Sequence, residues 1–401
     1  MSELEVDEAR RSSNELTVLH LGHSHSRGGA EMALARMLRS PMWNATVARP
    51  PVMEDAGAAD PFVDVSPDVV LRAVGPMSRA GASKATRLAA LQFAWNLVRQ
   101  AFSLRFSREF RSVDIVHANT TRSGLYGALA CILAPRVRLV VHLRDAVTAE
   151  SIGSLGALVY RYLVLRRADG VVANSHHTLQ SALDAAPMMR AKTLVLASAS
   201  GIKPKLTESV SVTDPPRNIG MVARLDPWKG QELLIRAFYA TGLAGKGMRL
   251  YFAGAAPFGN EPYARHLRSL TESLGLAPYV EFLGHVDDVD SFIDKMDVCV
   301  QSSTRAEPLG QNVLQYLSRG KPTVASDEGG PKEWIQHEVN GVLFESRSQK
   351  SLEYMLLRLV HNSGMRLDLA RQAVATPGLK TDEEISRDML KFFNVVAGGA
   401  S

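Results

Sequence analysis

Residues 301–344 read QSSTRAEPLGQNVLQYLSRGKPTVASDEGGPKEWIQHEVNGVLF. Glu307 stands just before a turn that opens a helix with apolar residues at helical spacing, and a Gly-Lys-Pro sequence ends that helix. A buried strand is predicted next, and Gly329 and Gly330 then open a second junction between a loop and a helix. Because helix N-termini offer free backbone N–H groups and a positive dipole end, this stretch is suited to bind an anion.

The length and the alternation of elements predict the architecture. At 401 residues the chain exceeds one ordinary core, so two domains are expected. Both halves alternate strands with helices, which predicts an α/β fold with parallel, doubly wound sheets. We expect a disordered tail over 1–14, a first domain over 15–203, a linker over 204–217, a second domain over 218–376, and a final helix and tail over 377–401.

The charge is unevenly distributed along the chain. Residues 1–205 hold 25 Lys and Arg against 17 Asp and Glu, a net charge of +8, whereas the whole chain has +5. A basic first half predicts an acidic partner, either a phosphorylated acceptor or an anionic membrane face. The sequence has no apolar run of 18 residues and no apolar core near its start, so neither a transmembrane helix nor a secretory signal is predicted. Cys131 and Cys299 lie in apolar contexts and are expected to be buried free thiols in a reducing cytoplasm.

Residues 79–111 interleave arginines with aromatic residues and contain one acid, Glu109. Apolar residues recur at roughly helical spacing within this segment. A basic amphipathic helix of this kind either lies on an anionic membrane surface or faces the core with a solvated basic side.

The first loop of the first half contains a pair of glycines. After the strand at 16–21, Gly28 and Gly29 precede a helix, which suits either a phosphate-cradling loop or a plain structural turn. The G-x-G-x-x-G spacing of dinucleotide-binding enzymes is absent, which argues against a dehydrogenase. His23 and His25 have no third ligand nearby, so no metal site is predicted.

Ligands of open parallel sheets bind beyond the carboxyl ends of the strands. His142 ends the strand at 138–143 and is therefore placed to face a cleft, the alternative being a hydrogen-bonded structural histidine. Asn119, Arg144 and Asp145 also follow strands and, with His23, are candidates for the acceptor side of the site.

The second half opens with a strand at 218–223 that runs into Arg224 and Lys229. Two cations five residues apart around a turn can reach one diphosphate, Lys as a point charge and Arg as a forked donor. The alternative is a pair of surface cations.

These motifs resemble those of the retaining glycosyltransferases of family 4, which have the GT-B fold. Glu307-Pro308-Leu309-Gly310 is similar to the family's Glu-x-Phe-Gly, and Arg224 to Gly230 is similar to its Arg-x4-Lys-Gly diphosphate clamp. The family's second acid, eight residues after the first, is replaced here by Gln315. Gly28 to Glu31 looks like the family's Gly-Gly-x-Glu loop, and His142-x-Arg144-Asp145 resembles its His-Asp motif with a different spacing.

The resemblance implies two Rossmann-like domains facing a central cleft, with a C-terminal helix that crosses back to the first domain. It implies that His142, Glu307, Arg224 and Lys229 serve catalysis, with His142 assisting the acceptor's proton transfer. The residues that it implies for donor binding are Gly28, Gly29, Arg224, Lys229, Gly284, Val286, Glu307, Leu309, Gly310, Gln311, Asn312, Gln315, Gly329 and Gly330.

The expected function is a metal-independent, cofactor-free transfer of a sugar, with retention, from a nucleotide diphosphate sugar to an acceptor hydroxyl. The basic aromatic segment favours a saccharide or lipid-linked acceptor of cell-surface polysaccharide or glycolipid synthesis, made in the cytoplasm at the inner membrane face. No nucleic-acid partner is expected. Two alternatives stay open: a non-catalytic relative that binds nucleotide-sugar or partners, because of Gln315, and a nucleotide-sugar 2-epimerase.

Overall fold

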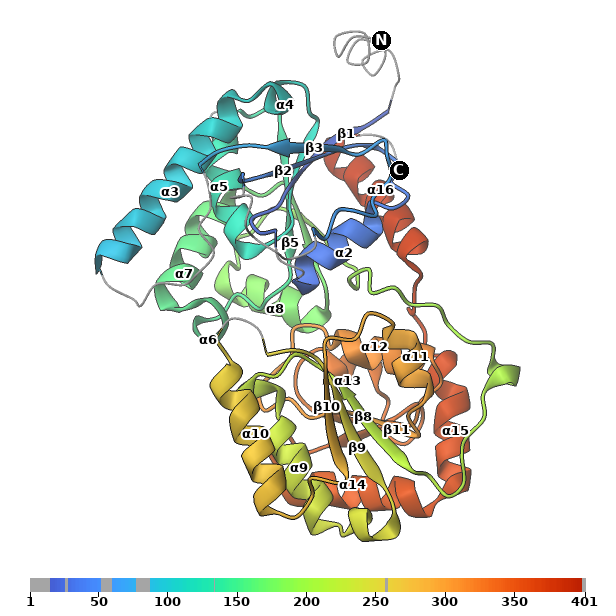
Figure 1. Ribbon diagram of the computed structural model, residues 1–401. Coiled ribbons are helices and arrows are strands. Elements are labelled where there is room, and N and C mark those ends of the chain that lie inside the picture. The colour runs from blue at the N-terminus through green and yellow to red at the C-terminus, as the bar shows by residue number, and fades with distance from the viewer. Residues whose placement is uncertain are drawn as a thin grey trace. The chain divides into compact units, whose positions relative to one another are not determined.

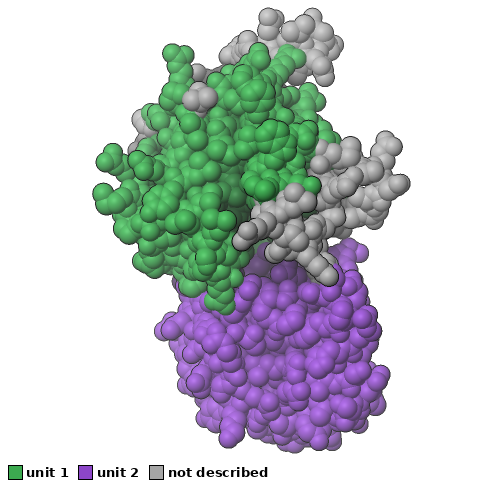
Figure 2. All heavy atoms as spheres, turned by 90° about the vertical axis from the view of Figure 1, so that its left-hand side faces the viewer, with its two compact units in different colours: residues 1–200, 382–401 green, residues 201–381 purple. Residues whose placement is uncertain are grey.

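The computed structural model describes residues 15–25, 28–51, 60–76, 87–132, 134–256 and 259–398. The chain forms two compact units (Figure 2). Unit 1 comprises residues 1–200 and 382–401, and unit 2 comprises residues 201–381. The predicted tail over 1–14 lies outside the described residues.

Unit 1 is built on a seven-stranded sheet in which every pairing is parallel (Figure 1). The strand order is β3-β2-β1-β4-β5-β6-β7. The strands are β1 (Thr17–Leu21), β2 (Asn44–Arg49), β3 (Val70–Ala73), β4 (Ile115–Ala118), β5 (Arg138–Leu143), β6 (Gly170–Ala173) and β7 (Lys192–Val195). The central strands are buried on both faces, which accounts for apolar runs in the sequence rather than alternation.

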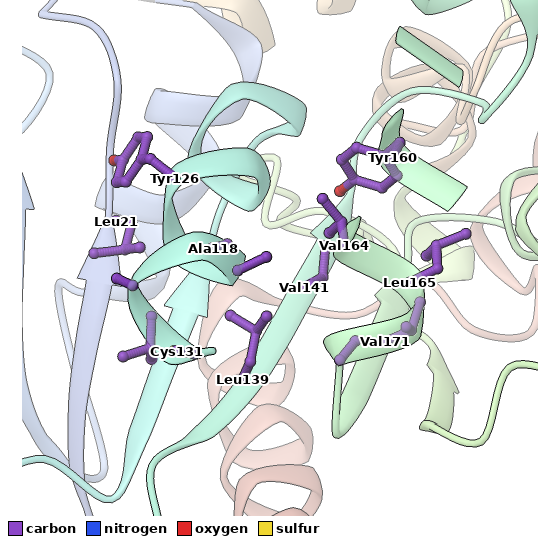
Figure 3. Close-up of a cluster of buried hydrophobic side chains, with 14 of the residues drawn as sticks. Leu21, Ala118, Tyr126, Cys131, Leu139, Val141, Tyr160, Val164, Leu165 and Val171 are labelled. Atoms are coloured by element: carbon purple, nitrogen blue, oxygen red, sulfur yellow. The ribbon is translucent and has the colours of Figure 1, made fainter. Parts of the chain in front are cut away.

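Helices cover both faces of this sheet. They are α2 (Gly29–Met37), α3 (Arg87–Phe106), α4 (Arg108–Arg111), α5 (Thr121–Cys131), α6 (Ala149–Ile152), α7 (Ser154–Val159), a π-helix (Tyr160–Leu165), α8 (His176–Ala185) and α16 (Asp382–Ala397). One core cluster joins Leu21, Leu139 and Val141 to Tyr126 of α5 and Tyr160 of the π-helix (Figure 3). The cluster of the other face packs Phe393 and Met389 of α16 onto the sheet, so the chain returns to unit 1 after unit 2.

Three buried histidines form a hydrogen-bonded row on the α16 face. Trp43 Nε1 donates to His20 Nε2 at 2.9 Å, so the proton of His20 is on Nδ1, which lies 2.8 Å from His117 Nδ1. His117 therefore carries its proton on Nε2, 3.4 Å from His142 Nδ1. The same logic leaves the proton of His142 on Nε2, which is buried and has no partner among the described residues.

Unit 2 has a six-stranded parallel sheet in the order β10-β9-β8-β11-β12-β13. Its strands are β8 (Asn218–Val222), β9 (Arg249–Ala253), β10 (Val280–Gly284), β11 (Val298–Gln301), β12 (Thr323–Ser326) and β13 (Val342–Phe344). Its helices are α9 (Gln231–Ala240), α10 (Glu261–Ser273), α11 (Val289–Asp294), α12 (Gln311–Ser318), α13 (Pro331–Trp334), α14 (Gln349–His361) and α15 (Ser363–Val374), with 3-10 turns at Thr207–Ser209, Pro227–Lys229 and Leu243–Lys246.

The predicted fold class is confirmed, since both halves are parallel sheets flanked by helices. The segment predicted as a linker, 204–217, belongs to unit 2, where Lys205 N donates to Ser318 O and Lys205 pairs with Asp294.

The predicted basic segment is interrupted at Ser107, whose side chain caps α4, and its first residues lie outside the described part of the chain. The prediction of free thiols is confirmed: Cys131 and Cys299 are buried and unpaired. Within the described ranges, no helix is long and apolar enough to span a bilayer.

We predict that acid destabilises unit 1 selectively. Burial lowers the pKa of His20 to about 3, and burial likewise places the pKa values of His117 and His142 well below 6.5. A histidine with a depressed folded pKa contributes stability that is complete above the unfolded pKa of about 6.5 and is lost as the pH falls below it, by up to about 1.4 kcal/mol per pH unit and group.

Hydrogen exchange at pH 7.5 and pH 5, corrected for intrinsic rates, tests this prediction. Protection of β1, β4 and β5 should fall by more than that of β8, β11 and β12. The unit 2 sheet is the internal control, because His266, His285, His337 and His361 of that unit are exposed. Equal changes in both sheets would contradict the prediction.

Candidate active site

Three loops leave the carboxyl ends of β8, β11 and β12 in unit 2. The first carries Arg224 and Lys229, the second carries Glu307, and the third carries Gly329 and Gly330. Neighbouring parallel strands end at one edge of a sheet, so these loops come together there.

Glycines lock the first two loops together. Gly230 begins α9 with φ of +77°, and a Cβ at this position would lie 1.9 Å from Ser302 O. Only glycine permits both the left-handed backbone and this approach. Thr304 N donates to Trp228 O at 2.8 Å, and Ser302 Oγ donates to Gly230 O at 3.0 Å. Packing therefore requires the glycine that follows Lys229 in the clamp motif, and its contacts fix the position of the Lys229 backbone.

The second and third loops are joined in the same way. Gly330 N donates to Glu307 O at 2.8 Å, and a Cβ on Gly329 would lie 2.3 Å from the same oxygen. The predicted role of Gly329 and Gly330 was to offer N–H groups to a phosphate. The Gly330 N–H is instead satisfied within the chain and helps to hold Glu307 in place, whereas phosphate binding by the Gly329 N–H stays a prediction.

Lys229 and Glu307 form a partly enclosed ion pair between the first two loops. Lys229 Nζ lies 2.5 Å from Glu307 Oε1, and the side chains are 17% and 8% exposed. Ser303 Oγ also donates to Oε1 at 2.6 Å. Burial disfavours the charge on Glu307, but Lys229, Ser303 and Gln301 outweigh it and lower its pKa below the usual value. Glu307 is therefore ionised at neutral pH and can accept hydrogen bonds from hydroxyl groups.

Trp228 is surrounded by three cations. The Lys229 Nζ, Arg305 Cζ and Arg224 Cζ atoms lie 3.9, 4.3 and 5.9 Å from the centre of its ring. Arg224 is also 3.3 Å from Asp226. Among the described residues Arg305 has no acidic partner, so the group carries an unbalanced positive charge. Sequence reasoning missed Trp228, which stands inside the motif from Arg224 to Gly230, and Arg305, which stands two residues before Glu307.

The donor residues predicted on α12 and just before it differ in exposure and in their contacts. Gly310 starts the helix with φ of +75°, and Asn312 Nδ2 donates to Val222 O at 3.0 Å, so Asn312 ties α12 to β8. Leu309 is 5% exposed, and Gln315 is 7% exposed. Gln311 is half-buried at the first turn.

A pocket of about 310 Å³ opens beside these loops, at the carboxyl ends of β8, β9 and β10. Leu225, Phe282 and Gly284 line it with apolar surface and backbone, and Glu261 and Arg265 supply polar groups. Gly284, one of the predicted donor-binding residues, thus lines this pocket. Val286 does not line the pocket and instead packs partly buried against a cluster that includes Phe292.

A second hollow of about 340 Å³ lies at the opposite edge of the sheet, next to Asn218 and Pro322. Two of its three lysines are engaged: Lys205 pairs with Asp294 at 2.7 Å, and Lys321 Nζ donates to the carbonyls of Asp294 and Met296. Because ligands of open parallel sheets bind at the carboxyl edge, we place the active site at the smaller pocket.

In unit 1, Arg144 is held by two side chains that follow other strands. Its guanidinium donates to Ser198 Oγ at 2.5 Å and to Asn119 Oδ1 at 2.7 Å. Burial lowers the pKa of Arg144 to about 10, so it remains charged. Arg144 and Asn119, two of the predicted acceptor-side residues, are thus directly bonded, whereas Asp145 is exposed beside them.

His23 and Glu31 complete this edge of unit 1. His23 Nδ1 lies 3.0 Å from Thr120 Oγ1 and 3.3 Å from Glu31 Oε1. Burial lowers the pKa of His23 to about 4 and raises that of Glu31. Glu31 accepts its own backbone N–H, and a Cβ on Gly28 would lie 2.5 Å from Glu31 Oε2. A carboxylate therefore already occupies the helix start where Gly28 and Gly29 were expected to cradle a phosphate.

His142 lies in the buried row described above and is 2% exposed. With the proton on Nε2, its free nitrogen is a donor. Accepting a proton there would require the tautomers of His117 and His20 to change together. Its catalytic role stays a prediction, and the structure offers Nε2–H donation as the available action.

No cluster of three or more His, Cys, Asp or Glu suited to a metal occurs within the described ranges. The residues that could hold an anionic co-substrate are the three cations around Trp228.

Two family models match the chain. The model described as Glycosyltransferase Family 4 matches residues 60–196, and the model described as Glycosyl transferases group 1 matches residues 203–375. The chain belongs to the family 4 type of glycosyltransferases.

Two curated relatives align with part of this family 4 chain. An uncharacterised glycosyltransferase, MJ1607 of Methanocaldococcus jannaschii, is 33% identical over 160 residues, which is 39% of each chain. A GDP-mannose-dependent alpha-(1-6)-phosphatidylinositol monomannoside mannosyltransferase of Mycobacterium tuberculosis is 32% identical over 135 residues, which is 32% of this chain and 34% of the relative. The chain thus spans about a third to two fifths of the length of these relatives.

Solved structures show the same fold over nearly the whole family 4 chain. Alr3699/HepE of Anabaena, solved in complex with UDP-glucose, matches with a TM-score of 0.75 and 24% identity, covering 95% of this chain and all of that one. The apo form of the lipopolysaccharide outer core galactosyltransferase WaaB matches with a TM-score of 0.66 and 17% identity, covering 94% of this chain and 99% of that one. The predicted GT-B fold is therefore confirmed.

We predict that Arg305→Gln weakens the binding of a nucleoside diphosphate about tenfold, because one charge-assisted contact is lost. Calorimetric titration measures the affinity. Arg371→Gln, which removes an exposed arginine from α15, is the matched control and should bind as the wild type does. Equal affinity of the Arg305 and Arg371 variants would show that Arg305 takes no part in binding.

Proposed function

We propose that this chain transfers a sugar from a nucleoside diphosphate sugar to an acceptor hydroxyl, with retention of configuration and without a metal. The observation that carries the proposal is the convergence of Arg224, Lys229 and Arg305 on Trp228, next to the ionised Glu307. Three positive side chains can stabilise the diphosphate that leaves, since charge develops there as the glycosidic bond breaks.

Each part of the proposed site has a distinct task. The nucleobase enters the pocket beside Gly284, and the diphosphate lies against the cations around Trp228. Glu307 accepts hydrogen bonds from sugar hydroxyls and fixes the ring. The bond from the anomeric carbon to the phosphate oxygen breaks, the acceptor oxygen forms the new bond on the same face, and the acceptor's proton passes to an oxygen of the leaving diphosphate.

The acceptor and the cellular location are proposed from unit 1. Its basic character favours an acidic or membrane-bound acceptor, as in polysaccharide or glycolipid synthesis. Two buried free thiols, Cys131 and Cys299, agree with a reducing cytoplasm, and we place the chain at the inner face of the membrane.

The activity is tested with a panel of nucleotide-sugars. One relative's structure was solved with UDP-glucose and another relative is named GDP-mannose-dependent, so these two donors begin the panel. We expect release of nucleoside diphosphate that increases when membrane lipid extract supplies acceptors, that persists in EDTA, and that yields a product with the donor's anomeric configuration by NMR.

Other results would select another function. Donor binding without any release would favour the non-catalytic alternative, and a sugar epimerised in the absence of acceptor would favour the 2-epimerase. Loss of activity in EDTA or an inverted product would contradict the metal-free, retaining mechanism.

We predict that Gln315→Glu raises the affinity for the donor about fivefold. A carboxylate accepts hydrogen bonds from ribose hydroxyls more strongly than an amide does, by about 1 kcal/mol. Calorimetry of the two proteins measures the difference, with Gln349→Glu in the first turn of α14 as the control. An unchanged or weaker affinity would mean that position 315 does not contact the ribose.

A further inference from the structure

Unit 1 presents an apolar surface on two neighbouring elements. On α3, Leu91, Trp95 and Phe102 are 68%, 64% and 65% exposed. On α7 and the π-helix, Leu155, Leu158 and Tyr162 are 71%, 52% and 56% exposed. Large apolar side chains that gather in this way mark an interaction site more often than scattered ones do. We call these six residues and the arginines around them the apolar-basic face.

Two of the helices that carry this face, α3 and the π-helix, are attached to the unit 1 core, and α7 leads directly into the π-helix. Leu97, Ala101 and Leu104 of α3 pack into the core cluster of Figure 3, and Gln100 Nε2 donates to Val74 O at 2.7 Å. The π-helix contributes Tyr160 and Val164 to the same cluster. The exposed side chains of α3 and of the π-helix therefore belong to the outer sides of packed helices, whereas α7 buries no residue.

The two elements lie on one side of the sheet. Both α3 and the π-helix pack on α5, and all three contribute to one core cluster. In Figure 1, α3 and α7 are at the upper left of the molecule. Their outer sides can therefore meet one extended partner.

The helices of this face carry arginines and no acidic residue. The sequences of α3, α5, α7 and the π-helix contain no aspartate or glutamate. Arg99, Arg161 and Arg166 are exposed on them. Arginines also lie over aromatic rings, with Arg161 Cζ 4.9 Å from the ring centre of Tyr162 and Arg122 Cζ 5.2 Å from that of Phe93. Apolar bodies with cationic tips suit the boundary between lipid headgroups and acyl chains.

We propose that the apolar-basic face docks on an anionic lipid bilayer. A second copy of the chain is disfavoured because a self-complementary contact would place arginines against arginines. An anionic leaflet instead offers both apolar depth and negative charge that attracts each arginine near its surface. The proposal deepens the membrane location proposed above, extends it from α3 to α7 and the π-helix, and does not depend on donor chemistry.

The test is flotation of the full chain with vesicles of phosphatidylcholine containing 30% phosphatidylglycerol. We expect binding that is lost with pure phosphatidylcholine and weakens as the salt concentration rises. The double variant Trp95→Glu, Arg99→Glu should reduce binding at least tenfold. The matched control, Met188→Glu with Arg190→Glu, makes the same chemical changes at exposed positions after α8 and should bind as the wild type does.

Two further measurements distinguish docking on the bilayer from a loss of binding that has another cause. Trp95 is exposed whereas Trp43 is buried, so brominated lipids should quench the wild type and quench Trp95→Phe far less, although that variant still floats. Calorimetric donor binding by the Trp95 and Arg99 double variant should match that of the control, which shows that unit 2 is intact.

The proposal is overturned if the wild type does not bind anionic vesicles at low salt, or if the control loses binding as much as the test variant. It is also overturned if the wild type is a dimer that the double variant dissociates, because the face would then pair copies of the chain. These results bear on the membrane location and the acceptor, whereas the donor chemistry is tested separately by donor binding in the absence of lipid.

Discussion

The ion pair between Lys229 and Glu307 is the contact on which the donor site depends. It joins the loop that follows β8 to the loop that follows β11, and both partners are largely withdrawn from water. A charge left alone in such a place would cost about 3–5 kcal/mol. The pair therefore constrains both loops together, and the surrounding backbone contacts keep that constraint rigid. The close approach of Gly230 to Ser302, and of Gly329 to Glu307, leaves no room for a side chain at either glycine. The loops can therefore pack in one arrangement.

The same ion pair also explains how the contacts within the site would change when a ligand binds. Burial lowers the pKa of the Lys229 ammonium, while Glu307 opposes this effect and keeps it charged. A bound diphosphate would add negative charge next to Lys229 and Arg305, both of which lie over Trp228. Lys229 would then be shared between the phosphate and Glu307, which would leave the carboxylate free to accept bonds from a sugar. The site is thus preorganised, and binding redistributes contacts that are already present.

The sequence predicted those features that depend on local patterns. The apolar runs at β1, β5 and β8 and the motif around Arg224 and Lys229 could be read because each is fixed by neighbours in the chain. Features that depend on distant contacts could not be read. β2 and the short edge strand β3 lie among Pro and Gly residues, and the Gly330 N–H is used by a residue 23 positions earlier. The row of His20, His117 and His142 arises only when three strands pair in register, so the single histidine at a strand end gave no sign of its buried partners.

The most direct test of the account is a calorimetric comparison of a nucleoside diphosphate with its sugar ester, using the nucleotide that the chain prefers. Wild type, Glu307→Gln and the neutral pair Lys229→Met with Glu307→Gln are titrated with both ligands. If Glu307 holds the sugar and Lys229 holds the diphosphate, Glu307→Gln should weaken the sugar ester about tenfold and spare the diphosphate, and the neutral pair should weaken both. Affinities that stay the same in the neutral pair would contradict the account, because the ion pair would then serve only the fold.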